Sequence, residues 1–137
     1  MLLQPKHLKY FLLISSFFYG FTGVALLFFP EEIAAYFQLD MDPGSSLLIQ
    51  LMGTLYLGFA FLNQSTAKGP MEPQFLKSVL ATNLGHSLMA GLTLVNSVGQ
   101  LNAPFAYVIG LLCLTYLTIG LMCGRLILRP PVNPKHV

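Results

Sequence analysis

The residue best suited to chemistry in this chain is His86, at the centre of an apolar stretch over residues 75–96. A helix of that length crosses a bilayer, so the imidazole would lie near the midplane, where ionisable side chains are rare and usually have a purpose. Four other polar residues fall at similar depths on the predicted helices: Asn83, Tyr19, Thr54 and Tyr116. These five side chains form the predicted ligand site. Such a polar layer could hold the polar head of an otherwise apolar molecule, for example a quinone or a sterol.

The sequence leaves two roles for His86 open. In one, the imidazole contacts a lipophilic ligand. In the other, it stays neutral and hydrogen-bonds Tyr19 or Tyr116 on another helix, which would fix the alignment of the two helices. In both roles we expect His86 to face the interior, because lipid would leave its N–H and its lone pair without partners.

The chain lacks the residues that other kinds of catalysis or cofactor binding would need. No Asp or Glu lies inside any of the four long apolar stretches, which argues against a proton-coupled antiporter built on a buried acid. His7 and His136 lie near the chain ends, too far from His86 to share a haem with it. Cys113 and Cys123 are ten residues apart on one predicted helix, about 15 Å, which is beyond the reach of a disulfide. The sequence therefore favours a non-catalytic protein and predicts neither a cofactor nor a metal.

Four apolar stretches must position the candidate residues: residues 8–29, 46–63, 75–96 and 103–128. Hydrophobic residues make up 55% of the 137-residue chain and charged residues 9%, whereas about 25% of a soluble domain is charged. Three of the stretches fall within the range of about 17–25 helical residues that spans the hydrocarbon core, and the fourth, of 26 residues, is long enough to cross it. We expect a single integral membrane domain over residues 1–137. Its predicted fold class is all-α, a four-transmembrane-helix bundle in contact with the lipid bilayer.

Charged residues separate across the predicted membrane. Threading the four spans in order places every basic residue on one side: Lys6, Lys9, Lys68, Lys77, Arg125, Arg129 and Lys135. The other side receives four acids and no basic residue: Glu31, Glu32, Asp40 and Asp42. Cytoplasmic segments retain Lys and Arg during insertion, so we expect a multi-pass protein with both termini in the cytoplasm. Topology explains the basic residues, and nothing indicates nucleic acid binding.

The segments between the predicted spans contain residues typical of helix starts and turns. Pro30, followed by Glu31 and Glu32, predicts a short helix over residues 31–38 that lies along the outer interface, because proline and acids suit a helix start. Residues 40–45 form a turn cluster, after which Ser45 or Ser46 would cap the second span. Residues 97–103 form the shortest connection, so the third and fourth spans should be antiparallel neighbours.

Each predicted span has one small or polar side, which should face inward because lipid solvates hydroxyls and amides poorly. The four sides consist of Ser15, Ser16, Tyr19, Thr22 and Gly23; Ser46, Gln50, Gly53 and Thr54; Asn83, His86, Ser87, Ala90 and Ser97; and Cys113, Tyr116, Gly120, Cys123 and Gly124. On the second span, Tyr56 and Asn63 fall on a different side. Gly120 and Gly124 permit close helix approach, either within the chain or in a homodimer.

Three short segments resemble a known family of small membrane proteins. They are Tyr19-Gly20-Phe21-Thr22-Gly23 with Phe29-Pro30-Glu31-Glu32, then Gly53-Thr54-Leu55-Tyr56-Leu57-Gly58, then Asn83-Leu84-Gly85-His86. Their order is similar to that in the DoxX-like group, particularly its DUF4345-type members. The resemblance covers the first three spans and implies a compact four-helix bundle. It also implies a subunit or accessory of a larger membrane system, in some cases a redox-linked one, and supplies no catalytic residues.

Three functions are compatible with these features. The first, which the sequence favours, is a non-catalytic binding or accessory subunit, whose partner would be a membrane subunit, a second copy or a lipophilic small molecule. The second is a membrane enzyme or redox component that handles a lipophilic substrate near His86. The third is an oligomeric channel or transporter, which would need a wet path along Gln50, Asn83, Ser87 and Thr93.

Overall fold

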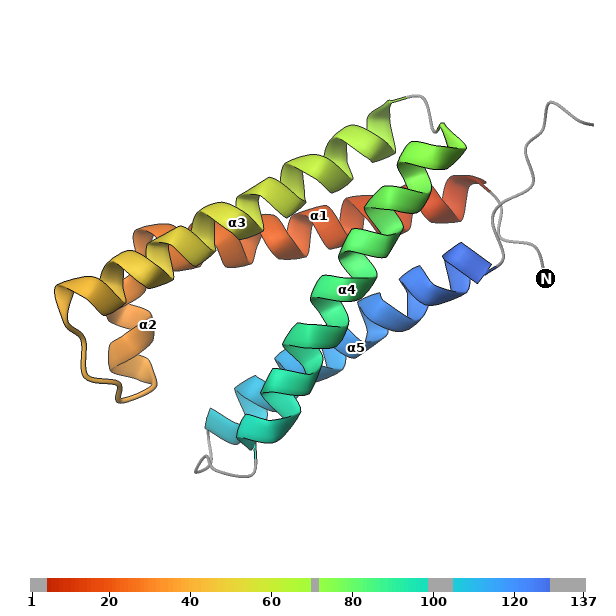
Figure 1. Cartoon of the computed structure of the whole chain (residues 1–137). Coiled ribbons are helices and arrows are strands. Elements are labelled where there is room, and N and C mark those ends of the chain that lie inside the picture. Colours follow the sequence, from red (N-terminus) through yellow and green to blue (C-terminus); the bar gives the residue numbers. More distant parts are fainter. Residues whose placement is uncertain (1–4, 70–71, 99–104, 129–137) are drawn as a thin grey trace, which may run out of the picture. The chain divides into compact units, whose positions relative to one another are not determined.

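The computed structural model describes residues 5–69, 72–98 and 105–128, and in these residues all regular structure is helical. The five helices are α1 (Pro5–Phe28), α2 (Pro30–Tyr36), α3 (Pro43–Lys68), α4 (Pro73–Val98) and α5 (Phe105–Leu128) (Figure 1). All except α2 are long and apolar enough to cross a membrane. The predicted all-α class, with four spanning-length helices and a short helix after the first, is confirmed for the described residues.

The chain divides into two compact units. The first hairpin comprises α1, α2 and α3, and the second hairpin comprises α4 and α5. In each hairpin the two long helices lie side by side (Figure 1). The prediction that the third and fourth spans are antiparallel neighbours is therefore confirmed. Residues 99–104, which join them, lie outside the described residues.

The first hairpin is held by a very close approach of α1 and α3. A Cβ added to Gly23 would lie 2.8 Å from the Gly53 carbonyl oxygen, and one added to Gly53 would lie 2.7 Å from the Leu27 nitrogen. The Ser16 hydroxyl donates across the pair to the Ala60 carbonyl at 2.8 Å. Only residues without side chains allow two helix backbones to come this close, so Gly23 and Gly53 position the two helices.

Helix α2 ends in a left-handed residue. Gln38 has φ 56°, the one positive φ among the described non-glycine residues. The Gln38 N–H bonds the Ala35 carbonyl and the Leu39 N–H bonds the Ala34 carbonyl, which is the Schellman pattern of helix termination. The short helix therefore spans Pro30–Tyr36 and stops before the predicted residue 38.

Helix α3 begins earlier than the hydroxyl pattern predicted. Its N-cap is Asp42, whose carboxylate accepts from the Ser45 backbone N–H at 2.7 Å. Pro43 occupies the first turn, where its missing N–H costs nothing. The prediction that Ser45 or Ser46 caps this helix was wrong, because the cap and the first turn use polar residues and proline that a search for apolar runs leaves out.

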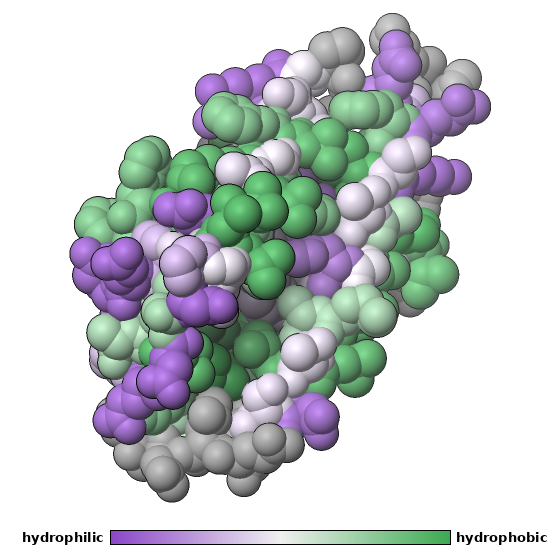
Figure 2. Space-filling model, turned by 60° about the vertical axis from the view of Figure 1, so that its left-hand side comes forward, coloured by the Kyte–Doolittle hydropathy of each residue, from purple (hydrophilic) through white to green (hydrophobic). Residues whose placement is uncertain are grey.

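Large apolar side chains cover much of the surface. Phe17, Leu121 and Met89 are 77%, 75% and 71% exposed. Hydrophobic residues form wide green areas on the face drawn in Figure 2. Soluble proteins rarely expose such areas, whereas lipid tails solvate them well. The surface therefore agrees with four helices suited to a bilayer.

Candidate functional site

His86 contacts Tyr116 across the second hairpin. The two ring centroids lie 5.7 Å apart with an interplanar angle of 73°, an edge-on contact. Tyr116 is 3% exposed, whereas His86 is half-buried. His86 also lies at the middle of α4 (Pro73–Val98). The structure thus turns the imidazole toward a residue of another helix that was one of its two predicted partners; the hydrogen bond between them stays a prediction.

Two further polar residues of α4 are buried on the same side as His86. Asn83 and Ser87 are 1% and 0% exposed. The Asn83 amide donates to the Val79 carbonyl at 2.9 Å. On α5, the buried Cys113 thiol lies 3.7 Å from the Gly91 carbonyl as a weak donor. We call Asn83, His86, Ser87 and Tyr116 the polar seam of the second hairpin; it offers an imidazole, an amide and two hydroxyls among apolar side chains.

The remaining two predicted site residues belong to the first hairpin. Tyr19 is fully buried, and its ring centroid lies 5.5 Å from that of Phe59 and 6.0 Å from that of Tyr56. Thr54 is exposed and donates to the Leu51 carbonyl of its own helix at 2.7 Å. The structure therefore brings Asn83, His86 and Tyr116 together within one hairpin. It places Tyr19 in an aromatic cluster of the other hairpin and Thr54 on that hairpin's surface.

The buried side of α3 differs from the predicted one. It contains Gly53, Ala60, Asn63 and Ala67, at spacings of seven, three and four residues. Asn63, which is 0% exposed, had been placed on a separate side. The prediction followed the hydroxyl of Thr54, but a threonine satisfies its hydroxyl on its own helix, whereas an asparagine amide does so less completely. A buried amide was the signal that could have found this face.

Threonine hydroxyls along the spans are engaged with their own helices. Thr22, Thr66, Thr82, Thr93, Thr115 and Thr118 each donate to the carbonyl four residues earlier, at 2.7–2.9 Å. This bond satisfies a polar group without a partner from outside the helix. These hydroxyl protons therefore contribute to the helices themselves.

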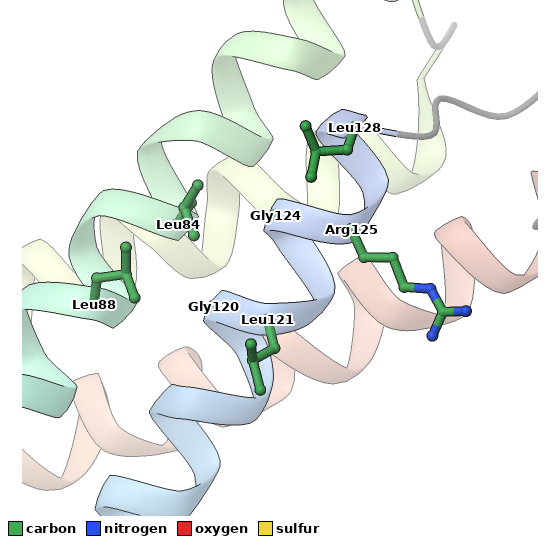
Figure 3. Close-up of a pocket in the computed structure, with 7 residues that line it drawn as sticks. All are labelled: Leu84, Leu88, Gly120, Leu121, Gly124, Arg125 and Leu128. Carbon is green, nitrogen blue, oxygen red and sulfur yellow. The ribbon is translucent and has the colours of Figure 1, made fainter.

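Each hairpin has a groove along its long helices, and a third groove of about 730 Å³ lies beside α2 and the start of α3. The groove on the first hairpin, of about 510 Å³, lies between Phe17 and Phe21 of α1 and Phe61 of α3, with Gln64 at one end. The groove on the second hairpin, of about 480 Å³, has Gly120 and Gly124 on its floor (Figure 3). In the described ranges, no group of three or more His, Cys, Asp or Glu residues could hold a metal.

Gly120 and Gly124, predicted as a close helix contact, face α4. A Cβ at Gly120 would lie 3.5 Å from the Ser87 Cβ, and one at Gly124 would lie 3.8 Å from the Leu84 Cδ1. Both are ordinary contact distances. These glycines therefore serve the packing of the second hairpin, while a homodimer through them stays a prediction.

No protein-family model, curated protein or solved structure matches this chain. The resemblance to the DoxX-like group stays a prediction from the sequence.

Proposed function

We propose that this chain is a non-catalytic binding or accessory subunit of a membrane system. The observation that carries the proposal is the polar seam of the second hairpin, where His86 packs edge-on against Tyr116 in the middle of a spanning-length helix. His86 is partly exposed, although its Nε2 atom is buried. A partner helix or the polar head of a lipophilic ligand would gain a hydrogen-bonding group there, in a medium that offers few others.

The hydrogen bonds of the threonine hydroxyls to their own helices favour a binding function over catalysis. A nucleophilic hydroxyl needs an adjacent base to remove its proton. In Thr82, Thr93, Thr115 and Thr118 that proton is directed to a backbone carbonyl instead. The side chains of the polar seam are suited to recognise a polar group, and of its four members only His86 is partly exposed.

A second candidate is a membrane enzyme or redox component acting on a lipophilic substrate beside His86. The contact between His86 and Tyr116 favours it, since both side chains can exchange protons. The channel interpretation has less support. Of its predicted lining residues on α4, Asn83 and Ser87 are buried, whereas Thr93, seven residues after His86, is exposed.

We further propose that both chain termini face the cytoplasm. The described basic residues support this orientation: Lys6 and Lys9 lie in the first two turns of α1, Lys68 ends α3, Lys77 lies near the start of α4, and Arg125 lies in the last turn of α5. Single cysteines at position 45 or position 65, in a chain carrying Cys113→Ala and Cys123→Ala, test the orientation. An impermeant thiol reagent should label position 45 from outside only and position 65 from inside only. Labelling of both from one side would contradict the four-span topology.

Native mass spectrometry after extraction in a mild detergent tests the binding function. We expect the wild-type chain to carry a stoichiometric small molecule or partner chain. His86→Leu should release it, His86→Asn should retain part of it, and Thr118→Val, on the side of α5 away from Tyr116, should retain all of it. His86→Asn should also be more stable than His86→Leu, by about 1 kcal/mol, because it keeps a hydrogen-bonding group in the seam.

The same experiment separates the candidates. Wild-type protein that carries neither a bound molecule nor a partner chain would contradict the binding proposal, as would His86→Leu protein that carries the same mass. A bound molecule that wild-type protein converts to another mass on incubation, and that His86→Leu protein leaves unchanged, would establish the enzyme instead.

A further inference from the structure

The groove on the second hairpin combines an apolar floor with a charged end. Leu84 and Leu88 of α4 form one wall, Gly120 and Gly124 of α5 form the floor, and Leu128 and Arg125 lie toward the end of α5 (Figure 3). The groove measures about 480 Å³. From Gly120 to Leu128 it follows α5 for about 12 Å, at 1.5 Å per residue. Its length and apolar lining suit a flexible hydrocarbon chain.

The floor is formed by two glycines on successive turns of α5, of which Gly120 is buried against Ser87 and Leu88. Gly120 and Gly124 lie four residues apart, so they fall on one side of the helix. Leu84 Cδ1 lies 3.8 Å from the position of a Cβ at Gly124, close enough to bound the groove but not to fill it. The space is therefore a feature of the packed hairpin, which holds without any contribution from another part of the chain.

Arg125 and Lys77 lie toward the same end of the second hairpin. Arg125 lines the groove with the stem of its side chain, and its guanidinium points away from Leu84 and Leu88 (Figure 3). Lys77 precedes Leu84 by seven residues, close to two helical turns, so it lies on the same side of α4. Because α4 and α5 are antiparallel, the start of α4 and the end of α5 meet at one end of the hairpin. Both basic side chains are exposed there.

We propose that this groove binds one anionic phospholipid. An acyl chain lies along Gly120 and Gly124, and the phosphate lies at the end of the hairpin that carries Arg125 and Lys77, whose long side chains turn toward it. Long basic side chains at helix ends reach the headgroup region, and each contributes attraction to anionic lipid. This assignment depends on the spanning length of the helices and is independent of the role of His86.

A second copy of the chain fits the same groove less well. In a two-fold dimer the same patch of both subunits meets, so Arg125 and Lys77 would face their own counterparts. Like charges repel most strongly where water is scarce. An anionic headgroup turns the same two charges into attraction.

Titration with defined lipids tests the proposal. Phosphatidylglycerol and phosphatidylcholine with identical acyl chains are added to the detergent-solubilised full chain, and bound lipid is counted by native mass spectrometry. We expect one phosphatidylglycerol to be retained in preference to phosphatidylcholine. Each charge removed, in Arg125→Gln or Lys77→Gln, should weaken that preference about fivefold, with Lys68→Gln on the other hairpin as the matched control.

A substitution in the groove tests the contribution of the acyl chain to binding separately from that of the headgroup. Gly124→Leu should fill the groove and lower retention of both lipids, whereas Gly110→Leu, on a part of α5 with open space around it, should not. Far-UV circular dichroism checks that each variant keeps its helices, and the charge variants test the proposal even if Gly124→Leu does not fold. Equal retention of the two lipids by wild-type protein would overturn the proposal. So would a dimer that Gly124→Leu dissociates while the lipid preference is unchanged.

Discussion

The two hairpins of this chain bring their helices together in different ways. In the first, glycine meets backbone: a Cβ at Gly53 would lie 2.7 Å from the Leu27 nitrogen and 2.8 Å from the Gly23 oxygen. In the second, glycine meets side chains: a Cβ at Gly91 would lie 3.1 Å from Leu117 Cδ2, near the flexible end of that residue. A side chain can rotate, whereas backbone moves only with its whole helix. A side chain at Gly53 would therefore force the two helices of the first hairpin apart, whereas at Gly91 a neighbouring side chain could move aside.

Polar groups are also used differently. In the first hairpin, the Ser16 hydroxyl bonds directly to the Ala60 carbonyl of the opposite helix, beside the aromatic cluster around Tyr19. In the second, the His86 ring is partly exposed, although its Nε2 atom is buried. A contact that is closed by hydrogen bonds and rings suits a structural role, while a partly exposed imidazole suits recognition. This difference is why the proposed binding function rests on the second hairpin.

The largest predicted effect comes from Gly53→Ala. The added methyl group would meet backbone atoms of α1 at 2.7 and 2.8 Å, so α1 and α3 must separate along their contact. We expect a loss of about 3 kcal/mol, at the upper end of overpacking costs. Gly58→Ala, on the same helix with nothing within 4 Å of the new Cβ, is the control and should be neutral or slightly stabilising. Equal thermal midpoints for the two variants in detergent would show that α1 and α3 are not in backbone contact.

A smaller effect is expected for the hydrogen bond that crosses the first hairpin. Ser16→Ala removes the donor to the Ala60 carbonyl and should cost about 0.6–1 kcal/mol, as other interhelical bonds in membranes do. Thr22→Val removes a hydroxyl that bonds only its own helix, at the Phe18 carbonyl, and should cost less. Thermal unfolding of the two variants side by side checks the order; a Thr22→Val loss as large as that of Ser16→Ala would remove the distinction between the two bonds.

The second hairpin should tolerate a change of the same kind. In Gly91→Ala the new methyl group meets Leu117 Cδ2 at 3.1 Å, and a small rotation of that leucine relieves the contact. We expect a cost below about 1 kcal/mol, well under that of Gly53→Ala. Gly85→Ala on the same helix, with no atom within 4 Å, serves as the reference. If Gly91→Ala proves as damaging as Gly53→Ala, the two hairpins do not differ in the way their glycines are used.

The smallest effect concerns the start of α3 and depends on pH. Hydrogen bonds from Ser45 hold the pKa of the Asp42 carboxyl below its ordinary value of 3.8. Because the folded-state pKa is lowered, the ionised cap stabilises the helix above that value, and this contribution is lost as pH falls through the lowered pKa. Amide hydrogen exchange in the first turn of α3 should therefore be faster in Asp42→Ala than in wild-type protein at neutral pH. The difference should begin to shrink as pH falls below 3.8 and should disappear once pH is below the lowered pKa. Asp42→Asn should cap with no such pH dependence, and a difference that persists in acid would contradict the assignment.

Local signals in the sequence determined the helices and their approximate ends. Apolar length alone predicts four spanning helices, since crossing the hydrocarbon core demands it. Proline and acids at residues 30–32 predict the short helix after the first span. The inward sides of α1 and α5 also follow from the sequence, because a helix places residues three and four apart on one side. Of their predicted members, Ser16, Tyr19, Tyr116 and Cys123 are buried.

Only the tertiary structure decided which residues meet. Gly23 and Gly53 lie thirty positions apart, and nothing in either neighbourhood indicates that their backbones touch. The pairing also decided that α3 buries Asn63 and exposes Thr54, and that the imidazole of His86 lies against Tyr116. Periodicity specifies a side of each helix to within about one residue, roughly 100°. The choice within that range depends on the shape of the opposite helix, which is a property of two distant segments together.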